Sequence, residues 1–445
     1  MDLNERKEIQ NTHHRGYSWA YYSLIAIGLW LMTGFYPMGY QKTAMMINDI
    51  ICGGALVVLG FLSLNPRRYW AMWAAVFIGG WLTVAPLFLH AETAVAYTTD
   101  TLMGILIMIF ILVIPNIPGI KAIKKEGPNV PPGWNYNPSS WPERIPVVFL
   151  GWFGFFVARY LAGYQLGYTN SIWDPFFGDG TRQILTSDVS ESFPVSDAGL
   201  GAFAYILDVI TGLAGRTARW RTMPWIVLIF GFLVIPLGIV SMTLVILQPL
   251  AVGAWCSACL LSALITVGMI PFTFDEVLAS LQFLRKKKKE GRSYWGTFWF
   301  GGTLEQGAVK IYTDPGNEQM KGTLKSMWKD LTLKPWNLFL SIAIGIWFMF
   351  MPSVFNYGGG LADSNHFVGA VIAALSIITM SEVARSGRLL NILCGLWLLA
   401  APWLFNNPGG TAFWVEIILS VVVISIAIPK GKIVDDHGGF NQYII

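Results

Sequence analysis

The chain has 445 residues, of which 54% are hydrophobic and 13% are charged, and its formal net charge is +4. A soluble domain carries about 25% charged residues, so this composition excludes an ordinary soluble protein and indicates a membrane protein. The basic residues lie along one face of the expected membrane protein and do not form a groove that would bind nucleic acid. Nothing therefore indicates nucleic-acid binding.

Twelve apolar segments are long enough to be interpreted as membrane-spanning helices, which need roughly 18 or more residues. We expect an all-α, polytopic membrane protein with about twelve transmembrane helices, embedded in a lipid bilayer. In chain order the segments lie near residues 17–36, 46–64, 69–89, 99–118, 145–165, 199–214, 224–248, 252–272, 336–355, 365–382, 388–405 and 411–429.

The positive charges between these segments predict the orientation, because Lys and Arg concentrate on the cytoplasmic side of a membrane. Of the 30 Lys and Arg residues, all but Lys42, Arg159 and Arg182 fall on one side, together with both termini. We therefore expect both termini in the cytoplasm, in a membrane such as the bacterial inner membrane. The acidic loop 166–198 is then expected on the periplasmic side.

The two ends of the chain repeat one pattern, in which a Gly is followed two positions later by Trp and then by Pro. The copies are Gly28–Leu31, whose proline comes late as Pro37, and then Gly79–Pro86, Gly345–Pro352 and Gly395–Pro402. Residues 17–118 and 336–429 therefore look like two copies of one four-helix unit, in which the Gly lets a neighbouring helix approach closely. The pattern resembles the SPW-repeat membrane proteins, which implies a helical membrane unit without known chemistry.

The middle of the chain lacks this repeat and carries a Cys-x-x-Cys pair, Cys256 and Cys259, at the start of the eighth expected span. Such a pair is a reversible dithiol/disulfide couple, and the N-terminus of a helix stabilises a thiolate. On the periplasmic side the cytosolic pools do not keep thiols reduced. We interpret the pair as a redox centre. The alternatives are two incidental core cysteines or a metal site. Because a metal site needs about four ligands, no metal is expected here.

The run Trp255-Cys256-Ser257-Ala258-Cys259-Leu260, which opens the last helix of a four-helix core, resembles the vitamin K epoxide reductase family. The resemblance implies a quinone pocket on the outer side, with Cys259 facing the quinone and Cys256 exchanging with a partner thiol. The implied reaction couples oxidation of the dithiol to reduction of a ubiquinone- or menaquinone-type quinone. It also implies a thioredoxin-like thiol protein in the periplasm as a partner.

The outer loop departs from the family's pattern, because residues 166–198 contain no cysteine pair that would relay electrons to the dithiol. Either a separate thiol protein reduces Cys256 and Cys259 directly, or the relay is lost and the activity with it.

Other candidate residues surround the pair. Trp255, which precedes it, is a candidate for quinone binding. Ser196 and Asp197 lie at the start of the sixth span, where they either cap the helix or contact a quinone oxygen. Asp208 lies halfway along that span, at a depth where a carboxylate must be paired or protonated. Arg159 in the fifth span is its expected partner, and this pair is either structural or part of a proton path.

These expectations divide the chain into four parts: an SPW-like four-helix unit at 1–120, a reductase-like four-helix bundle at 145–290, a cytoplasmic linker at 291–335 and a second SPW-like unit at 336–445. The expected function is a membrane thiol oxidoreductase that couples a periplasm-facing CxxC dithiol to quinone reduction. The alternative is a non-catalytic scaffold or accessory subunit with a degenerate core, bound to other membrane subunits through its repeat units. A transporter is a third class, although the two repeat copies share one orientation.

Overall fold

The structure is a computed structural model that describes residues 12, 14–40, 43–114, 127–304, 307, 335–405 and 409–444. The described residues are helical and form no strand, which confirms the predicted all-α class. Ten of their helices are long and apolar enough to cross a membrane. Two further expected spans, α2 (Ser18–Gly34) and α9 (Asp197–Leu213), have 17 residues each. The number twelve therefore stays a prediction.

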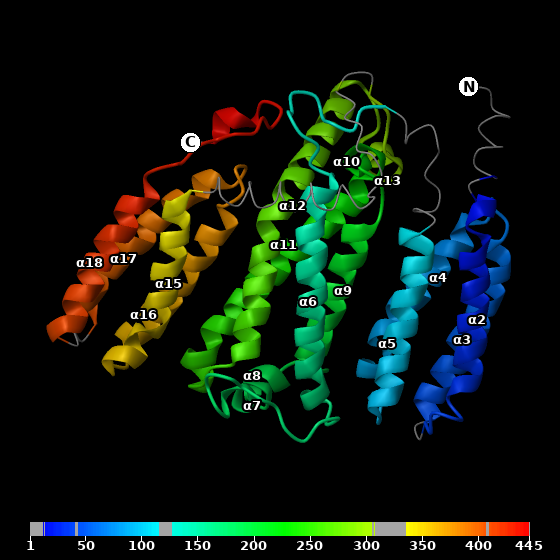
Figure 1. Ribbon diagram of the computed structural model, residues 1–445, viewed down its shortest axis with the longest axis horizontal. Coiled ribbons are helices and arrows are strands. Elements are labelled where there is room, and N and C mark those ends of the chain that lie inside the picture. Colours follow the sequence, from blue (N-terminus) through cyan, green and yellow to red (C-terminus); the bar gives the residue numbers. More distant parts are fainter. Residues whose placement is uncertain are drawn as a thin grey trace, which may run out of the picture.

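Two four-helix units lie at opposite ends of the molecule, with the central helices between them (Figure 1). The first unit contains α2, α3 (Thr43–Ser63), α4 (Tyr69–Phe88) and α5 (Ala94–Met108), which continues as the π-helix η1 (Ile109–Val113). The last unit contains α15 (Trp336–Phe355), α16 (Gly360–Ile378), the 3₁₀-helix η4 (Arg385–Leu389), α17 (Leu390–Leu404) and α18 (Gly410–Ala427).

Each repeat is a helical hairpin whose two helices cross at small residues. A Cβ atom added to Gly28 would lie 2.6 Å from the carbonyl oxygen of Gly53, and a Cβ on Gly53 would lie 2.5 Å from that of Gly28. The same crossing pairs Gly79 with Gly104, Gly345 with Gly369 and Gly395 with Ser420. Each glycine that opens the repeat pattern thus lets two backbones meet, which is how small residues act in membrane helix packing.

The centre is a bundle of four long helices: α6 (Trp141–Gln165), α9, α11 (Pro224–Leu247), which continues as the π-helix η3 (Gln248–Val252), and α12 (Ser257–Lys289). The outer loop between α6 and α9 folds into two short helices, α7 (Gly180–Leu185) and α8 (Asp188–Glu191). The opposite end carries α10 (Arg219–Thr222), α13 (Tyr294–Phe300) and the 3₁₀-helix η5 (Phe440–Tyr443). Part of the expected linker is thus helical, and residues 305–306 and 308–334 of it lie outside the described residues.

Buried arginines close the bundle at the end opposite the outer loop. Arg144 and Arg219 both donate to the carbonyl oxygen of Ala214, just after the last turn of α9, at 2.9 Å. Arg219 also forms a buried ion pair with Glu276 of α12, at 2.5 Å. Cations at a helix C-terminus interact favourably with its carbonyl groups, so these side chains join α6, α9 and α12 at one end.

Candidate functional site

Cys256 and Cys259 are joined by a disulfide at the first turn of α12. Cys256 is the residue before the helix, and its sulfur accepts a hydrogen bond from the backbone N–H of Cys259 at 3.0 Å. Gln248 fixes the backbone just before the helix, because its Oε1 accepts a hydrogen bond from the backbone N–H of Cys256 at 3.0 Å. Cys256 is 0% exposed, whereas Cys259 is partly exposed and lines a cavity. The two sulfurs therefore face different surroundings.

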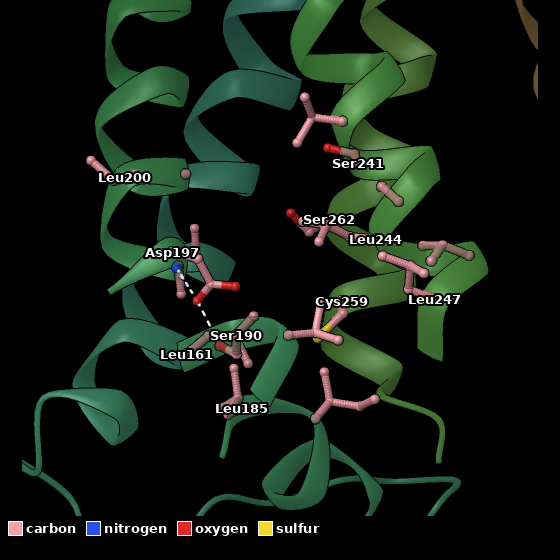
Figure 2. Close-up of a pocket in the computed structure, with 18 of the residues that line it drawn as sticks. Leu161, Leu185, Ser190, Asp197, Leu200, Ser241, Leu244, Leu247, Cys259 and Ser262 are labelled. Atoms are coloured by element: carbon pink, nitrogen blue, oxygen red, sulfur yellow. Dashed lines mark hydrogen bonds between the residues drawn. The ribbon is translucent and has the colours of Figure 1, made fainter. Parts of the chain in front are cut away.

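The cavity beside Cys259 has a volume of about 370 Å³ and lies among α6, α7, α8, α9, α11 and α12. This volume is within the range of pockets that hold small organic ligands, which are about 300–1,000 Å³. Most of its wall is apolar, including Leu161 and Leu185 on one side and Leu244 and Leu247 on the other (Figure 2). Its character fits an apolar ligand.

Two groups of polar side chains interrupt the apolar wall. Asp197 and Ser190 lie on the side of the pocket opposite Cys259 (Figure 2). The second group is Tyr205, Ser262 and Thr266, in which the Tyr205 hydroxyl donates to the carbonyl oxygen of Ser262 and lies 2.7 Å from the Thr266 hydroxyl.

Sequence reasoning missed the second group, although helical periodicity carries a signal for it. Ser262 and Thr266 follow Cys259 by three and seven residues, and residues so spaced share one face of a helix. Tyr205 likewise follows Asp197 by eight residues on α9, about two turns further along.

Ser196 and Asp197 serve different purposes at the start of α9. The Ser196 hydroxyl accepts from the backbone N–H of Gly199 at 2.9 Å, which is the helix-capping alternative, and it donates to Gln165 Oε1 at 2.5 Å. Asp197 lines the cavity. Its Oδ1 accepts hydrogen bonds from Gln165 Nε2 at 2.5 Å, from the Ser190 hydroxyl at 3.0 Å and from the backbone N–H of Ala198 at 2.8 Å.

The expected pair of Asp208 and Arg159 is wrong. Arg159 donates instead to the Thr98 hydroxyl at 2.6 Å, and its guanidinium lies 5.9 Å from the centre of the Tyr97 ring in the first repeat unit. Both carboxyl oxygens of Asp208 are buried without a hydrogen-bond partner among the described residues. The two side chains belong to different helices, whose rotation about their axes the sequence pattern does not define, so their pairing was not predictable.

Trp255 and Ser196 were expected to contact a quinone, but neither lines the cavity. The Ser196 hydroxyl is used within the protein, as described above. The Trp255 ring packs against Phe177 of the outer loop at a centroid distance of 6.0 Å. It also packs against two residues of the last repeat unit, Phe350 at 4.6 Å and His366 at 4.8 Å. Trp255 therefore joins the disulfide helix to the loop and to that unit.

Asp174 fastens the outer loop to the start of the disulfide helix. Its carboxylate accepts from the backbone N–H of Ser257 at 3.1 Å, from the Ser257 hydroxyl and from the Thr181 hydroxyl at 2.5 Å. The amides of Phe176 and Phe177 donate to it as well. Burial acts to raise the pKa of Asp174, but these hydrogen bonds favour the ionised form and hold the pKa below its ordinary value. The loop is thus held by a carboxylate at a helix N-terminus, where negative charge is stabilised.

The described part of the chain contains no group of three or more His, Cys, Asp and Glu side chains that could hold a metal ion.

Comparison with known families separates the centre of the chain from its ends. Residues 145–274 match the vitamin K epoxide reductase family, and residues 18–113 and 335–429 match the SPW repeat domain. No curated protein and no solved structure matches the chain. Both resemblances drawn from the motifs are thus confirmed. The chain is an integral membrane protein, and its centre supports a function of the thiol oxidoreductase type.

Proposed function

We propose that this chain, whose residues 145–274 belong to the vitamin K epoxide reductase family, passes electrons from a dithiol to a quinone. Cys256 and Cys259 form the redox couple, and the quinone binds in the cavity beside Cys259. The observation that carries the proposal is the position of Cys259, which closes a disulfide and also lines an apolar cavity of about 370 Å³. A two-electron couple in contact with a pocket for an apolar ligand is what such a transfer requires.

The reaction runs in two balanced steps. A partner dithiol attacks the disulfide through a mixed disulfide, and the partner leaves oxidised while Cys256 and Cys259 become thiols. The pair then gives two electrons to the quinone and closes again. The two thiol protons are released and the quinone gains two protons, so that one dithiol and one quinone yield one disulfide and one quinol.

The fit of a quinone rests on the cavity wall. Leucine side chains offer an apolar surface to the ring and to the start of an isoprenoid tail. The Tyr205 and Thr266 hydroxyls both donate to the Ser262 carbonyl oxygen, which leaves the Ser262 hydroxyl to donate to a quinone oxygen. Pockets with an apolar wall and a few placed polar groups are typical for such ligands. A ubiquinone or a menaquinone is the expected substrate.

The partner is proposed to be a thioredoxin-like thiol protein in the periplasm, because the described outer loop carries no cysteine pair. The start of α2 and the end of α18 lie at the end of the molecule opposite α7 and α8 (Figure 1). This supports an orientation with both termini in the cytoplasm and the disulfide on the periplasmic side of a bacterial inner membrane. The proposed division into units 1–120, 145–290, 291–335 and 336–445 is supported instead by the family matches at residues 18–113, 145–274 and 335–429.

Thiol trapping in isolated membranes tests this function. After reduction, Cys256 and Cys259 should become protected from an alkylating reagent when quinone is added, and Cys259→Ser should abolish that protection. The double variant Cys52→Ser with Cys394→Ser is the matched control, because both of these cysteines are free thiols, and it should behave as the unaltered chain does. A pair that stays reduced with quinone present would contradict the proposal.

The alternative is a scaffold with an inactive core, and the complete burial of Cys256 favours it. In that case Cys256→Ser and Cys259→Ser should leave assembly with other membrane subunits unchanged, and quinone should have no effect on the thiols.

A further inference from the structure

We propose that Ser190 and Asp197 form a proton relay that joins the quinone cavity to a water-filled groove on the outer side. This inference rests on the proposed function and assigns a route for the protons that the reaction needs. The cavity itself is mostly apolar and is bounded on its outer side by the loop that carries α7 and α8. A proton therefore needs a defined path through this wall.

A second cavity lies on the other side of the same wall. It has a volume of about 530 Å³ and is lined by polar side chains, among them His90, Gln165, Thr186, Glu191 and Ser196. Thr186 and Glu191 are exposed, so this groove is open to water. Leu185, Ser190 and Phe193 line both cavities, and they form the partition between the two.

Ser190 is the polar member of this partition. Its hydroxyl donates to Asp197 Oδ1 at 3.0 Å and accepts from Gln165 Nε2 at 2.7 Å. Ser190 is buried and lines both the cavity and the groove. A proton taken up from groove water can replace the one that Ser190 passes to Asp197, which a hydroxyl allows because it both donates and accepts.

Asp197 is placed to deliver the proton to the cavity. Its three hydrogen bonds converge on Oδ1, and the described residues donate none to Oδ2. Figure 2 shows one carboxyl oxygen of Asp197 directed toward the side of the pocket where Cys259 lies. A carboxyl group positioned in this way can act as a general acid toward a quinone oxygen.

Gln165 holds the relay in place. Its Nε2 binds both Ser190 and Asp197, and its Oε1 accepts from the Ser196 hydroxyl and from the backbone N–H of Ala198. An amide does not exchange its protons readily, so Gln165 is a positioning residue, and the moving proton is carried by Ser190 and Asp197 alone.

The proton count stays balanced. Each turnover removes two protons from the thiols of Cys256 and Cys259 and adds two to the quinone. The Cys259 thiol, which lines the cavity, supplies one of them, and the relay supplies the other to the quinone oxygen that faces Asp197. Asp197 is refilled through Ser190 from groove water, and the remaining thiol proton returns to water and balances this uptake. No further oxidant or reductant is needed.

The test measures quinol formation by the purified full-length protein, which is first reduced with dithiothreitol and then mixed anaerobically with a water-soluble short-chain quinone. Asp197→Asn should slow quinol formation by about 100-fold, the lower end of general acid catalysis, and Ser190→Ala by about tenfold. Ser190→Thr keeps the hydroxyl and should restore most of the rate. The solvent isotope effect in D₂O should differ between the Ser190→Ala variant and the unaltered protein.

Ser192→Ala is the matched control, because the Ser192 hydroxyl lies in the same loop, is exposed and donates only to the carbonyl oxygen of Val189. It should leave the rate unchanged. Reduction of the disulfide by dithiothreitol and the KM for quinone should change by less than about twofold in all variants. If the unaltered protein forms quinol while Ser190→Ala and Ser190→Thr both keep its rate, the relay is overturned and the proposed function stands. If the unaltered protein forms no quinol, the proposed function falls, and the relay falls with it.

Discussion

Asp174 connects the outer loop to the helix that begins directly after Cys256. The carboxylate binds the first turn of α12 through Ser257 and is itself only 8% exposed, and Phe177 next to it packs on Trp255. Since Cys256 is completely buried beneath this arrangement, a partner thiol reaches its sulfur only after the loop has moved. The loop thus lies between the disulfide and the proposed partner thiol.

Asp174→Asn should loosen this loop. The amide that replaces the carboxylate loses charge-assisted hydrogen bonds, each of which contributes about 1.5–3 kcal/mol, and we expect the disulfide to be reduced at least about tenfold faster by a water-soluble thiol. The rate of reduction is followed by trapping the free thiols at fixed times.

Asp179→Asn is the control for this variant, because Asp179 lies in the same loop and forms an exposed ion pair with Arg182 at 3.5 Å. Exposed pairs contribute little, so its rate of reduction should match that of the unaltered protein. Equal rates for the Asp174 and Asp179 variants would show that the loop does not limit access.

The helical hairpins of the repeat units depend on close backbone contact. Gly53 and Gly54 are neighbours in α3, yet a Cβ on Gly53 would clash with the backbone of Gly28, whereas a Cβ on Gly54 would meet nothing within 4 Å. Substitutions at these two adjacent positions therefore separate the effect of packing on stability from the effect of helix propensity.

Gly53→Ala should therefore destabilise the first repeat unit by about 1–3 kcal/mol, the usual cost of overpacking. Gly54→Ala should be neutral or slightly stabilising, since alanine favours a helix by up to about 1 kcal/mol over glycine. Thermal unfolding of both purified variants in the same detergent measures the difference. An equal loss of stability in the two would contradict the hairpin crossing as described.

Most elements of this fold were predictable from the sequence, because apolar runs of sufficient length specify membrane helices. The Gly-Trp-Pro pattern predicted the repeat units, and Cys256 and Cys259 were expected at the first turn of a helix, where the structure has them. The cavity was not predictable, since its wall combines residues of α6, α7, α8, α9, α11 and α12. The role of Asp174 was missed for the same reason, because 83 residues separate it from Ser257.

At the scale of the whole molecule, the last repeat unit is attached to the redox site. Phe350 of α15 and His366 of α16 contact Trp255, and His366 Nε2 lies 3.3 Å from the carbonyl oxygen of Val245 in α11. The first unit contacts the other side of the bundle through α4 and α9. The repeat units therefore enclose the reductase-like centre between them and support the helix that carries the disulfide.

The orientation of the whole chain can be tested at two exposed positions, Ser192 in the outer loop and Glu290 after α12. A cysteine introduced by Ser192→Cys should react with a membrane-impermeant maleimide once the outer membrane is permeabilised. A cysteine introduced by Glu290→Cys should react only after the inner membrane is lysed. Labelling of both positions before lysis, or the reverse order, would contradict the expected topology and the helix count behind it.

The central claim is that Cys256 and Cys259 give their two electrons to a quinone. Its most direct test is an anaerobic single turnover, in which fully reduced, purified protein is mixed with excess quinone and both products are counted. The account predicts one quinol and one Cys256–Cys259 disulfide for each protein molecule. A dithiol that remains reduced with no quinol formed would contradict it.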